Sequence, residues 1–506
     1  MQTGLGIVVG VDRDGEHVYM PAYSKGPRPS YNLYKVSLST GEGHLHMRGV
    51  RDTLEWFVDE QGKVLARVDY SNSHGRYRLK SKLTGEWETV YRTDKGSHVV
   101  DVEAVGKDEQ SLLFNDVEGD RVVTRAISLL DGSISEPLYS NETADVDYLM
   151  QNRNGQVFGV VYSGFKPGID LLDSDLNALY DAISGRYPDA SLYFTSWSDD
   201  KTSVVFLVDG GQKGSGYYLI DTETFKIRHL ADKYSVAAYG KIKPIQYSAR
   251  DGLKIPSLLT FPQGREDAKN LPLIVLPRSN AKSYNRIGFD WLAQYLAAKG
   301  YLVLQPNSRG SSGFGSELAP AGVGQWWRAM QDDISDGVTS LIESGYADAD
   351  RVCILGRSYG GYSALAGGAF SPSLYRCVVS INGVSNLWDM MNSARYQRYS
   401  SHWVRSYWRQ MMRRTDFEKN DLRDISPINF VDNFDAATLL LHGDADTTIP
   451  IFQSKRMYSA LKKAGKEATL VKLKGKGHWL SNSKTRLQAL VAIDQFLDTH
   501  NPAVLN

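Results

Sequence analysis

One serine of the 506-residue chain stands in a setting that suits a nucleophile. It is Ser358, the centre of the G-x-S-x-G pattern GRSYG, between an apolar run at 351–356 and a small-residue stretch at 361–369. A sharp turn from strand to helix leaves no room for side chains beside the serine, which is why glycines flank it. The turn exposes the hydroxyl and aims the first helix amides at it, so we predict the backbone N–H of Tyr359 as an oxyanion donor. The pattern indicates hydrolysis or acyl transfer through an activated serine.

A serine of this kind needs a general base, and the base needs a carboxylate that orients it. On a strand–turn–helix nucleophile the chain order is Ser, then Asp or Glu, then His. The stretch TLLLHGDADTTIP at 438–450 runs from a strand into an acidic turn and offers both Asp444 and Asp446. Two histidines follow, one of them among the last seven residues, whereas His478 lies in the glycine-rich loop GKGHWL. We therefore predict His478 as the base, and we interpret His442, which precedes both acids, as structural.

These residues require elements that hold them at one edge of a sheet. Apolar, strand-like runs at 271–277, 301–306, 351–356 and 377–383 alternate with helical patterns at 288–299, 325–344 and 361–369. Near-continuous apolar strands between helices are typical of a parallel sheet covered on both faces. Cys353 and Cys377 fall in two of these strands and are interpreted as small core residues, too few for a disulfide framework. We expect an α/β domain at 241–506.

The residues before about 240 have a different pattern, polar and rich in short alternating segments. Five segments resemble one another, at 33–42, 77–86, 123–132, 168–177 and 217–226. Each reads as a strand that enters a turn, and the turn ends recur at a period of roughly 45 residues, which is typical of β-propeller blades. An irregular β-sandwich is the alternative, but it gives no reason for so long a period. We expect an all-β, propeller-like domain at 1–240.

The second half resembles the catalytic domain of the prolyl oligopeptidase family of serine peptidases, nearest its acylaminoacyl-peptidase-like branch. The resemblance rests on RDGLKIPSLLTFP, PLIVLP, GYLVLQPNSRGSSGFG, MQDDISDGV, DADRVCILGRSYGGYSALA, SPINFVDNF, LLLHGDADTTIP and KGHW, in family order. It implies an α/β-hydrolase fold and a propeller before it that restricts access to the serine. It also implies that Asp446 is the acid, within H-G-x-x-D-x-x-(V/I)-P, and that Asp444 is a turn residue.

Two features depart from the family pattern. Family propellers usually have seven or eight blades, so five repeats imply either a reduced propeller or a numbered chain that lacks its first blades. Where the family has His-Gly-Gly-Pro after the PLIVLP strand, this chain has Arg278-Ser279-Asn280-Ala281. We predict Arg278 near the mouth of the site. Its guanidinium would donate to the oxyanion or bind a substrate carboxylate, unless it only faces solvent.

A long insertion at 386–430 combines aromatic residues with arginines. Such stretches can bind nucleic acid by stacking and phosphate contacts, but a chain without net charge favours helices that line the substrate pocket. The members of the insertion are Trp388, Arg395, Tyr396, Arg398, Tyr399, Trp403, Arg405, Tyr407, Trp408, Arg409, Arg413 and Arg414. We predict Trp388 and Trp403 as substrate-binding residues.

Composition limits the class of protein. Basic and acidic residues number 58 each, so the net charge of zero argues against nucleic-acid and polybasic membrane partners. Apolar runs are only strand-length, and no signal peptide is visible at the N-terminus, so we expect a cytoplasmic protein. We predict a serine hydrolase that cleaves short peptides or acyl-peptides, without a cofactor or metal and possibly as a homo-oligomer. The alternatives are an esterase or amidase on a non-peptide substrate and a catalytically silent binding protein.

Overall fold

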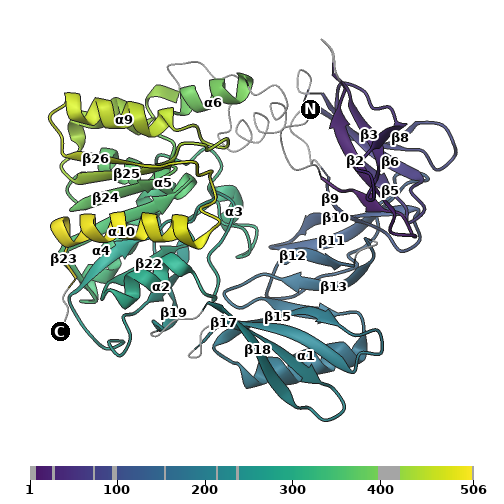
Figure 1. The fold of residues 1–506 in the computed structure, drawn as a ribbon, viewed down its shortest axis with the longest axis horizontal. Coiled ribbons are helices and arrows are strands. Elements are labelled where there is room, and N and C mark those ends of the chain that lie inside the picture. Colours follow the sequence, from purple (N-terminus) through teal and green to yellow (C-terminus); the bar gives the residue numbers. More distant parts are fainter. Residues whose placement is uncertain are drawn as a thin grey trace. The chain divides into compact units, whose positions relative to one another are not determined.

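The computed structural model describes residues 7–24, 29–71, 75–93, 100–152, 155–211, 215–234, 239–396 and 422–503. Figure 1 shows strands through most of the first half and a mixture of strands and helices in the second. The chain divides into two compact units, Met1–Gly164 with Gly168–Ala178, and Phe165–Pro167 with Leu179–Asn506. The domain boundary at 240 stays a prediction drawn from composition, whereas the compact units divide earlier in the chain.

The described residues of the first half form five successive antiparallel sheets, each built from three or four consecutive strands. They are β1 (Gly10–Val11), β2 (His17–Tyr23), β3 (Tyr31–Ser37) and β4 (Gly43–Met47); β5 (Thr53–Val58), β6 (Val64–Ser71), β7 (Arg76–Ser81) and β8 (Glu88–Thr93); β9 (Asp101–Val105), β10 (Ser111–Glu118) and β11 (Arg121–Ser128); β12 (Val146–Gln151), β13 (Val157–Tyr162) and β14 (Gly168–Leu171); and β15 (Ala190–Trp197), β16 (Ser203–Gly210), β17 (Ser215–Asp221) and β18 (Ile227–Tyr234). Successive antiparallel meanders of this size are the blade pattern of a propeller-like region, as predicted.

The five predicted repeats coincide with the third strand of each sheet and the turn that follows it. In four of them the turn contains a residue with positive φ, namely Gly41, Gly85, Gly132 and Phe225. Glycine reaches this conformation without steric cost, and Phe225 adopts it at φ 54° despite its side chain. The same backbone turn therefore repeats even where the residue type does not.

The fourth repeat differs from the prediction of a turn near residue 177. β14 leads into helix α1 (Ser174–Arg186), and Asp173 accepts the N–H of Leu176 at 3.1 Å in the manner of an N-cap. Leu176, Tyr180 and Ile183 are buried and recur at helical spacing. The prediction of a blade turn was wrong here because an N-cap and a 3.6-residue apolar period outweigh the resemblance to the other repeats.

One eight-stranded sheet forms the centre of the second half. Its order is β19 (Ile242–Ser248), β20 (Lys254–Thr260), β22 (Leu302–Pro306), β21 (Leu271–Val275), β23 (Ala347–Arg357), β24 (Cys377–Ile381), β25 (Ala437–Gly443) and β26 (Ala468–Leu473). β19 and β20 form the predicted hairpin, and from β22 to β26 the neighbours are parallel. The carboxyl ends of the parallel strands therefore share one edge of the sheet, as predicted for an α/β-hydrolase domain.

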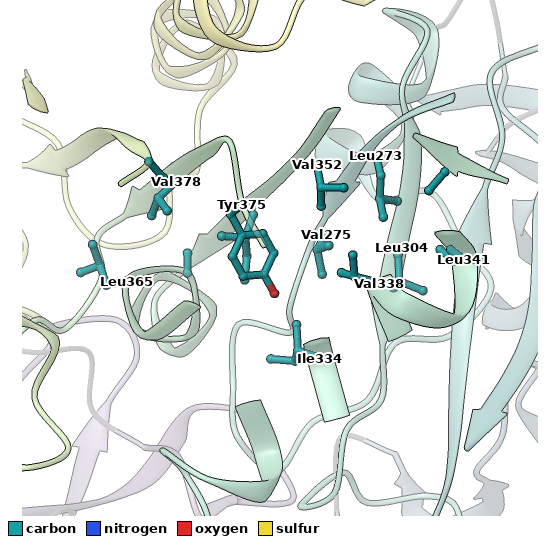
Figure 2. Packing of buried hydrophobic residues seen from close by; sticks show 14 of the residues in the cluster. Leu273, Val275, Leu304, Ile334, Val338, Leu341, Val352, Leu365, Tyr375 and Val378 are labelled. Carbon is teal, nitrogen blue, oxygen red and sulfur yellow. The ribbon is translucent and has the colours of Figure 1, made fainter. Parts of the chain in front are cut away.

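Helices cover both faces of this sheet because alternate strand residues point to opposite faces. Leu273 packs with Val338 and the other residues of the cluster in Figure 2, whereas its neighbour Ile274 packs with Leu296 on the other face. Among the described residues, the helices of the second half are α2 (Trp291–Ala298), α3 (Leu318–Ala321), α4 (Ala329–Glu343), α5 (Tyr359–Phe370), α6 (Leu387–Tyr396), the 3₁₀ helix η1 (Pro427–Asn433), α9 (Phe452–Lys463) and α10 (Ser483–His500). No helix within the described ranges is long and apolar enough to cross a membrane.

Cys353 and Cys377 form a disulfide between the neighbouring strands β23 and β24. They are fully buried, as expected of core residues, but the interpretation as core residues was incomplete. The parallel register sets the two cysteines directly opposite each other, with 4.7 Å between their Cα atoms. A sequence separation of 24 residues conceals this proximity, because it follows from strand pairing alone.

The last antiparallel sheet, β15 to β18, is joined by hydrogen bonds to the loop that precedes α2. Ser191 Oγ donates to the carbonyl of Ile287 at 2.6 Å, and the N–H of Phe289 donates to Asp209 Oδ1 at 2.8 Å. The N–H of Ile287 also donates to the carbonyl of Phe165 at 2.7 Å. These bonds explain why the sheet and residues 165–167 belong to the same compact unit as the second half.

Candidate active site

Ser358 occupies the sharp turn between β23 and α5. Its φ of +58° and ψ of −117° lie outside the regions that a serine ordinarily adopts. A side chain at Gly356 would place its Cβ 2.0 Å from the carbonyl of Gly360, so glycine is required where the chain folds back on itself. The N–H of Ser358 donates to Ile381 at the end of β24. The surroundings thus over-determine a strained backbone, and a partly exposed hydroxyl results.

His478 connects the serine to a buried carboxylate. Its Nε2 lies 3.0 Å from Ser358 Oγ, and its Nδ1 lies 2.7 Å from Asp446 Oδ2. An ionised carboxylate only accepts hydrogen bonds, so Nδ1 carries the proton and Nε2 is left as the acceptor for the hydroxyl. The three predicted residues therefore form a continuous chain of hydrogen bonds at the carboxyl edge of the sheet.

The carboxylate of Asp446 is completely buried and fixed by its own turn. Its Oδ1 accepts the N–H groups of Thr448 and Ile449, each at 2.8 Å. Asp444 is exposed by contrast, and its Oδ1 accepts the N–H of Gly475 at 2.6 Å, which shapes the neighbouring loop. Of the two acids that the residues alone left open, only Asp446 meets the histidine.

His442 stabilises the turn at 446–449, which holds Asp446. Its Nε2 lies 2.8 Å from the carbonyl of Ile449, and its Nδ1 lies 2.7 Å from Ser454 Oγ. Burial lowers the pKa of His442, so the ring is neutral, with Nε2–H donating and Nδ1 accepting. Ile449 in turn donates its N–H to Asp446. This arrangement agrees with the interpretation of His442 as structural.

The predicted oxyanion donor already has a partner. The N–H of Tyr359 donates to the carbonyl of Ser279 at 3.2 Å, in the loop that follows β21. That loop lies close against the start of α5, since a Cβ on Gly360 would come within 2.6 Å of the carbonyl of Pro277. The Tyr359 amide can hold an oxyanion only if this bond is exchanged for one to the substrate oxygen.

Arg278 does not have the role that the sequence predicts. All five of its guanidinium N–H groups are directed at neighbouring oxygens. Nε donates to the carbonyls of Asn280 and Ala281, and Nη1 donates to the carbonyl and Oγ of Ser308. Nη2 donates to the carbonyls of Ala281 and Arg309. The side chain is buried rather than solvent-facing. No donor is left for an oxyanion or a substrate carboxylate, and Arg278 instead fastens the loop after β21 to the loop after β22.

Comparison with known proteins identifies the second half of the chain. Residues 287–502 match the model of the prolyl oligopeptidase family, and this range contains the serine, the acid and the histidine described above. Residues 287–502 belong to the prolyl oligopeptidase family.

Relatives of this family domain extend into the first half as well. Dipeptidyl aminopeptidase BIII of Pseudoxanthomonas mexicana is 27% identical over 88% of this chain and 66% of its own length. Human acylamino-acid-releasing enzyme is 25% identical over 51% of this chain and 35% of its own length. The chain thus spans less than two thirds of these curated relatives. A puromycin-hydrolyzing peptidase of Mycobacterium tuberculosis shares the fold, with a TM-score of 0.75 at 18% identity, covering 98% of this chain and 78% of its own.

Asn382 is a residue of the prolyl oligopeptidase family domain that the sequence analysis missed. Its Nδ2 donates to the carbonyl of His478 at 2.8 Å, and its Oδ1 accepts the N–H of Gly443 at 2.9 Å. It is fully buried at φ +50°, a conformation that asparagine tolerates better than most residues. A polar residue directly after the apolar run CVVSI was the available signal. Asn382 ties the histidine loop of the family domain to the ends of two strands.

The predicted substrate-binding tryptophans have different outcomes. Trp388 is half-buried and packs against an apolar cluster that includes Tyr359, the residue after the nucleophile. Within this cluster Trp326 contacts Tyr359 edge-on, with 4.8 Å between ring centroids. Trp403 lies outside the described residues, as do most residues of the predicted insertion. A role of Trp388 in binding stays a prediction.

A metal site needs several ligating side chains close together. Within the described ranges, no group of three or more His, Cys, Asp or Glu is arranged to hold a metal ion. Asp446 and His478 are hydrogen-bonded to each other, and the remaining oxygen of Asp446 accepts two backbone N–H groups.

Proposed function

We propose that the chain is a serine peptidase of the prolyl oligopeptidase type that forms an acyl-enzyme on Ser358. The observation that carries the proposal is the hydrogen-bonded chain from Asp446 through His478 to Ser358, within a domain of that family. The assignment of the triad to these three residues is part of the proposal. The complete series of hydrogen bonds from Asp446 to Ser358 argues against a catalytically silent binding protein.

In the proposed first half-reaction, Ser358 Oγ attacks the substrate carbonyl while its proton passes to His478 Nε2. The imidazolium is stabilised by Asp446, which also keeps the ring in the productive orientation. When the tetrahedral intermediate collapses, the C–N bond breaks, and Nε2 returns the proton to the leaving amine. Water then attacks the ester, loses a proton to Nε2 and releases the acid, and Ser358 regains its proton.

We infer that the substrate oxygen takes the place of the Ser279 carbonyl on the Tyr359 amide. An amide donor stabilises the negative charge that develops in the tetrahedral state more than it stabilises a neutral carbonyl. A small displacement of the loop after β21, which Arg278 holds, would free the donor. Loop adjustment is thus a required step of the proposed cycle.

Fluorophosphonate labelling combined with two families of substrates tests the proposal. We expect labelling of the wild-type chain at Ser358, turnover of dipeptidyl or acyl-aminoacyl anilides, and loss of both in Ser358→Ala. Asp444→Asn serves as a matched control, because this exposed acid lies in the same turn as Asp446. Absence of labelling would overturn the proposal.

An esterase or amidase acting on non-peptide substrates is the second candidate. It is favoured by the hydrogen bond from Tyr359 to Ser279, because an ester is more reactive than a peptide and depends less on a fully open oxyanion site. Labelling together with turnover of acyl esters but not of any anilide would support this candidate over the peptidase.

Restriction to short peptides or small acyl substrates by the propeller-like region stays a prediction. Turnover is expected to fall steeply with substrate length, whereas rapid digestion of a folded globular protein would contradict it. The absence of nucleic-acid and membrane partners and the formation of a homo-oligomer also stay predictions.

The cytoplasmic location stays a prediction as well, and the disulfide between Cys353 and Cys377 counts against it. Thiols in the cytosol are kept reduced, so a buried disulfide favours an oxidising compartment. Alkylation under denaturing, non-reducing conditions measures the state of the pair in native protein. Two alkylated cysteines would favour the cytoplasm, and none would favour an oxidising compartment.

A further inference from the structure

The residue after the catalytic histidine is an exposed tryptophan. Trp479 is 68% exposed, the largest fraction for any large apolar side chain in the described part of the chain. Its ring meets the ring of His478 edge-on, with centroids 5.0 Å apart and planes at 89°. A large apolar side chain is thus exposed to solvent directly beside the imidazole of His478.

This exposure is imposed by the residues on both sides of Trp479. The carbonyl of His478 is held by Asn382, and Leu480 is buried against the sheet. Leu480 has a φ of +49°, which is unfavourable for leucine and persists only where the surroundings fix it. Asn482 then caps α10 by accepting the N–H of Thr485 at 2.9 Å. A buried leucine and a fixed histidine leave the tryptophan directed outward.

We propose that Trp479 is the platform for the first residue of the leaving group, which its indole contacts through an aromatic or large apolar side chain. The inference rests on the proposed acyl-enzyme mechanism, in which His478 Nε2 gives its proton to the leaving amine. That amine must come within about 3 Å of Nε2 to receive the proton. Because Trp479 contacts the same imidazole ring, the residue attached to the amine lies next to the indole.

The chemistry of an indole determines which leaving groups it favours. Its flat, rigid surface loses little conformational entropy on binding and pairs well with another aromatic ring. A glycine in the leaving group offers the indole no side chain, so it gains nothing from this contact. Trp479 therefore selects on the leaving-group side of the scissile bond, without a direct part in the proton transfers.

Partitioning of the acyl-enzyme between water and added amines tests the platform directly. The acyl-enzyme is formed from an acyl ester, and phenylalanine amide or glycine amide is supplied as the acceptor. By microscopic reversibility the acceptor occupies the position of the leaving group. We expect wild-type protein to prefer phenylalanine amide over glycine amide by about tenfold, the size of discrimination that one apolar contact gives.

Two variants and one control separate a platform from a structural role. Trp479→Ala is expected to reduce the preference to about twofold or less, and Trp479→Phe is expected to keep most of it. Leu487→Ala, which truncates a similarly exposed apolar side chain on α10, is expected to leave the preference unchanged.

Failure of the inference is distinguishable from failure of the proposed mechanism. An unchanged preference in Trp479→Ala, with the ester consumed normally, would overturn the platform and leave the mechanism intact. Lack of both ester turnover and fluorophosphonate labelling in wild-type protein would overturn the mechanism, and the platform with it.

Discussion

In the proposed mechanism, the base side of Ser358 consists of side chains, whereas its oxyanion side consists of backbone groups. On the base side, His478 and Asp446 are buried, and each heteroatom of the carboxylate has a partner. On the oxyanion side, the Tyr359 amide is bonded to Ser279, in a loop whose position depends on Arg278. The base side is complete as it stands, and the oxyanion side has to exchange a bond before it can act.

This difference means that, in the proposed mechanism, the groups for proton transfer are fixed, whereas the group for oxyanion binding is adjustable. Proton transfer needs specific titratable groups, so substitution on the base side removes the chemistry itself. Oxyanion binding needs only an N–H in the right position, so its strength is set by the loop that covers it. Substitutions on the two sides are therefore expected to have different signatures.

The largest expected effect is on the base side. Ser358→Ala and His478→Ala should each lower kcat by about 10⁶-fold. The members of a triad act as a unit, so removing one of them costs nearly as much activity as removing all three. Turnover of a peptide anilide is the measurement, with circular dichroism to verify the fold. Substantial activity in either variant would show that another residue supplies the nucleophile or the base.

The acid is expected to matter somewhat less. Asp446→Asn should lower kcat by about 10⁴, since the asparagine permits the wrong tautomer of His478. Asp444→Asn should change kcat by no more than a few-fold, because this acid only shapes the loop at Gly475. A larger loss in Asp444→Asn than in Asp446→Asn would reverse the assignment of the acid.

On the oxyanion side, Arg278→Met tests whether the loop controls the donor. We expect kcat to fall by about 10²–10³, the range for a lost oxyanion donor, with equal effects on acidic and neutral substrates. Arg278→Lys keeps the charge and some of the donors, and it should lose less. If KM rose only for substrates that carry a carboxylate, the substrate-binding role predicted from the sequence would stand after all.

The smallest expected effect concerns pH and the support of the acid turn. The pKa of His442 is lowered by burial from its ordinary value of 6.5, so below this pH the unfolded chain binds the proton more readily than the folded one. The free energy of unfolding should therefore fall as pH drops from 6.5, by at most about 1.4 kcal/mol per pH unit from this residue. Urea unfolding at several pH values, compared with His442→Gln, isolates the contribution; equal slopes would refute it.

The hydrogen-bonded arrangement of Ser358, His478 and Asp446 was predictable because its signals are local. The glycines around Ser358 and the loop around His478 mark strand ends, and strand ends of a parallel sheet meet at one edge. The choice between Asp444 and Asp446 needed the family pattern, since both residues lie in one acidic turn. Their difference arises from burial, which the sequence of a turn does not display.

The contacts of Arg278 and the disulfide could not be predicted from the sequence, because both depend on the pairing of segments that are distant in the chain. Arg278 follows an apolar strand in the position of a functional residue, but its partners Ser308 and Arg309 come from another strand end. The disulfide between Cys353 and Cys377 likewise depends on register, and a register shift of one residue would place the two side chains on opposite faces. Helix α1 differs from the predicted repeat for another reason, because the bond from Leu176 N–H to Asp173 and the apolar period of Leu176, Tyr180 and Ile183 favour a helix.

The hydrogen bonds between β15–β18 and the loop before α2 decide how the chain can be dissected. A recombinant fragment that begins at residue 241 would lose the partners of Ile287 and Phe289, three bonds in all. It would also lose Tyr234, whose ring stacks on Phe289 with 4.4 Å between the ring centroids. The ring of Phe289, just before α2, would lose this contact. A fragment that begins at residue 165 would keep all three bonds, because Phe165 and the sheet β15–β18 belong to the same compact unit as the second half.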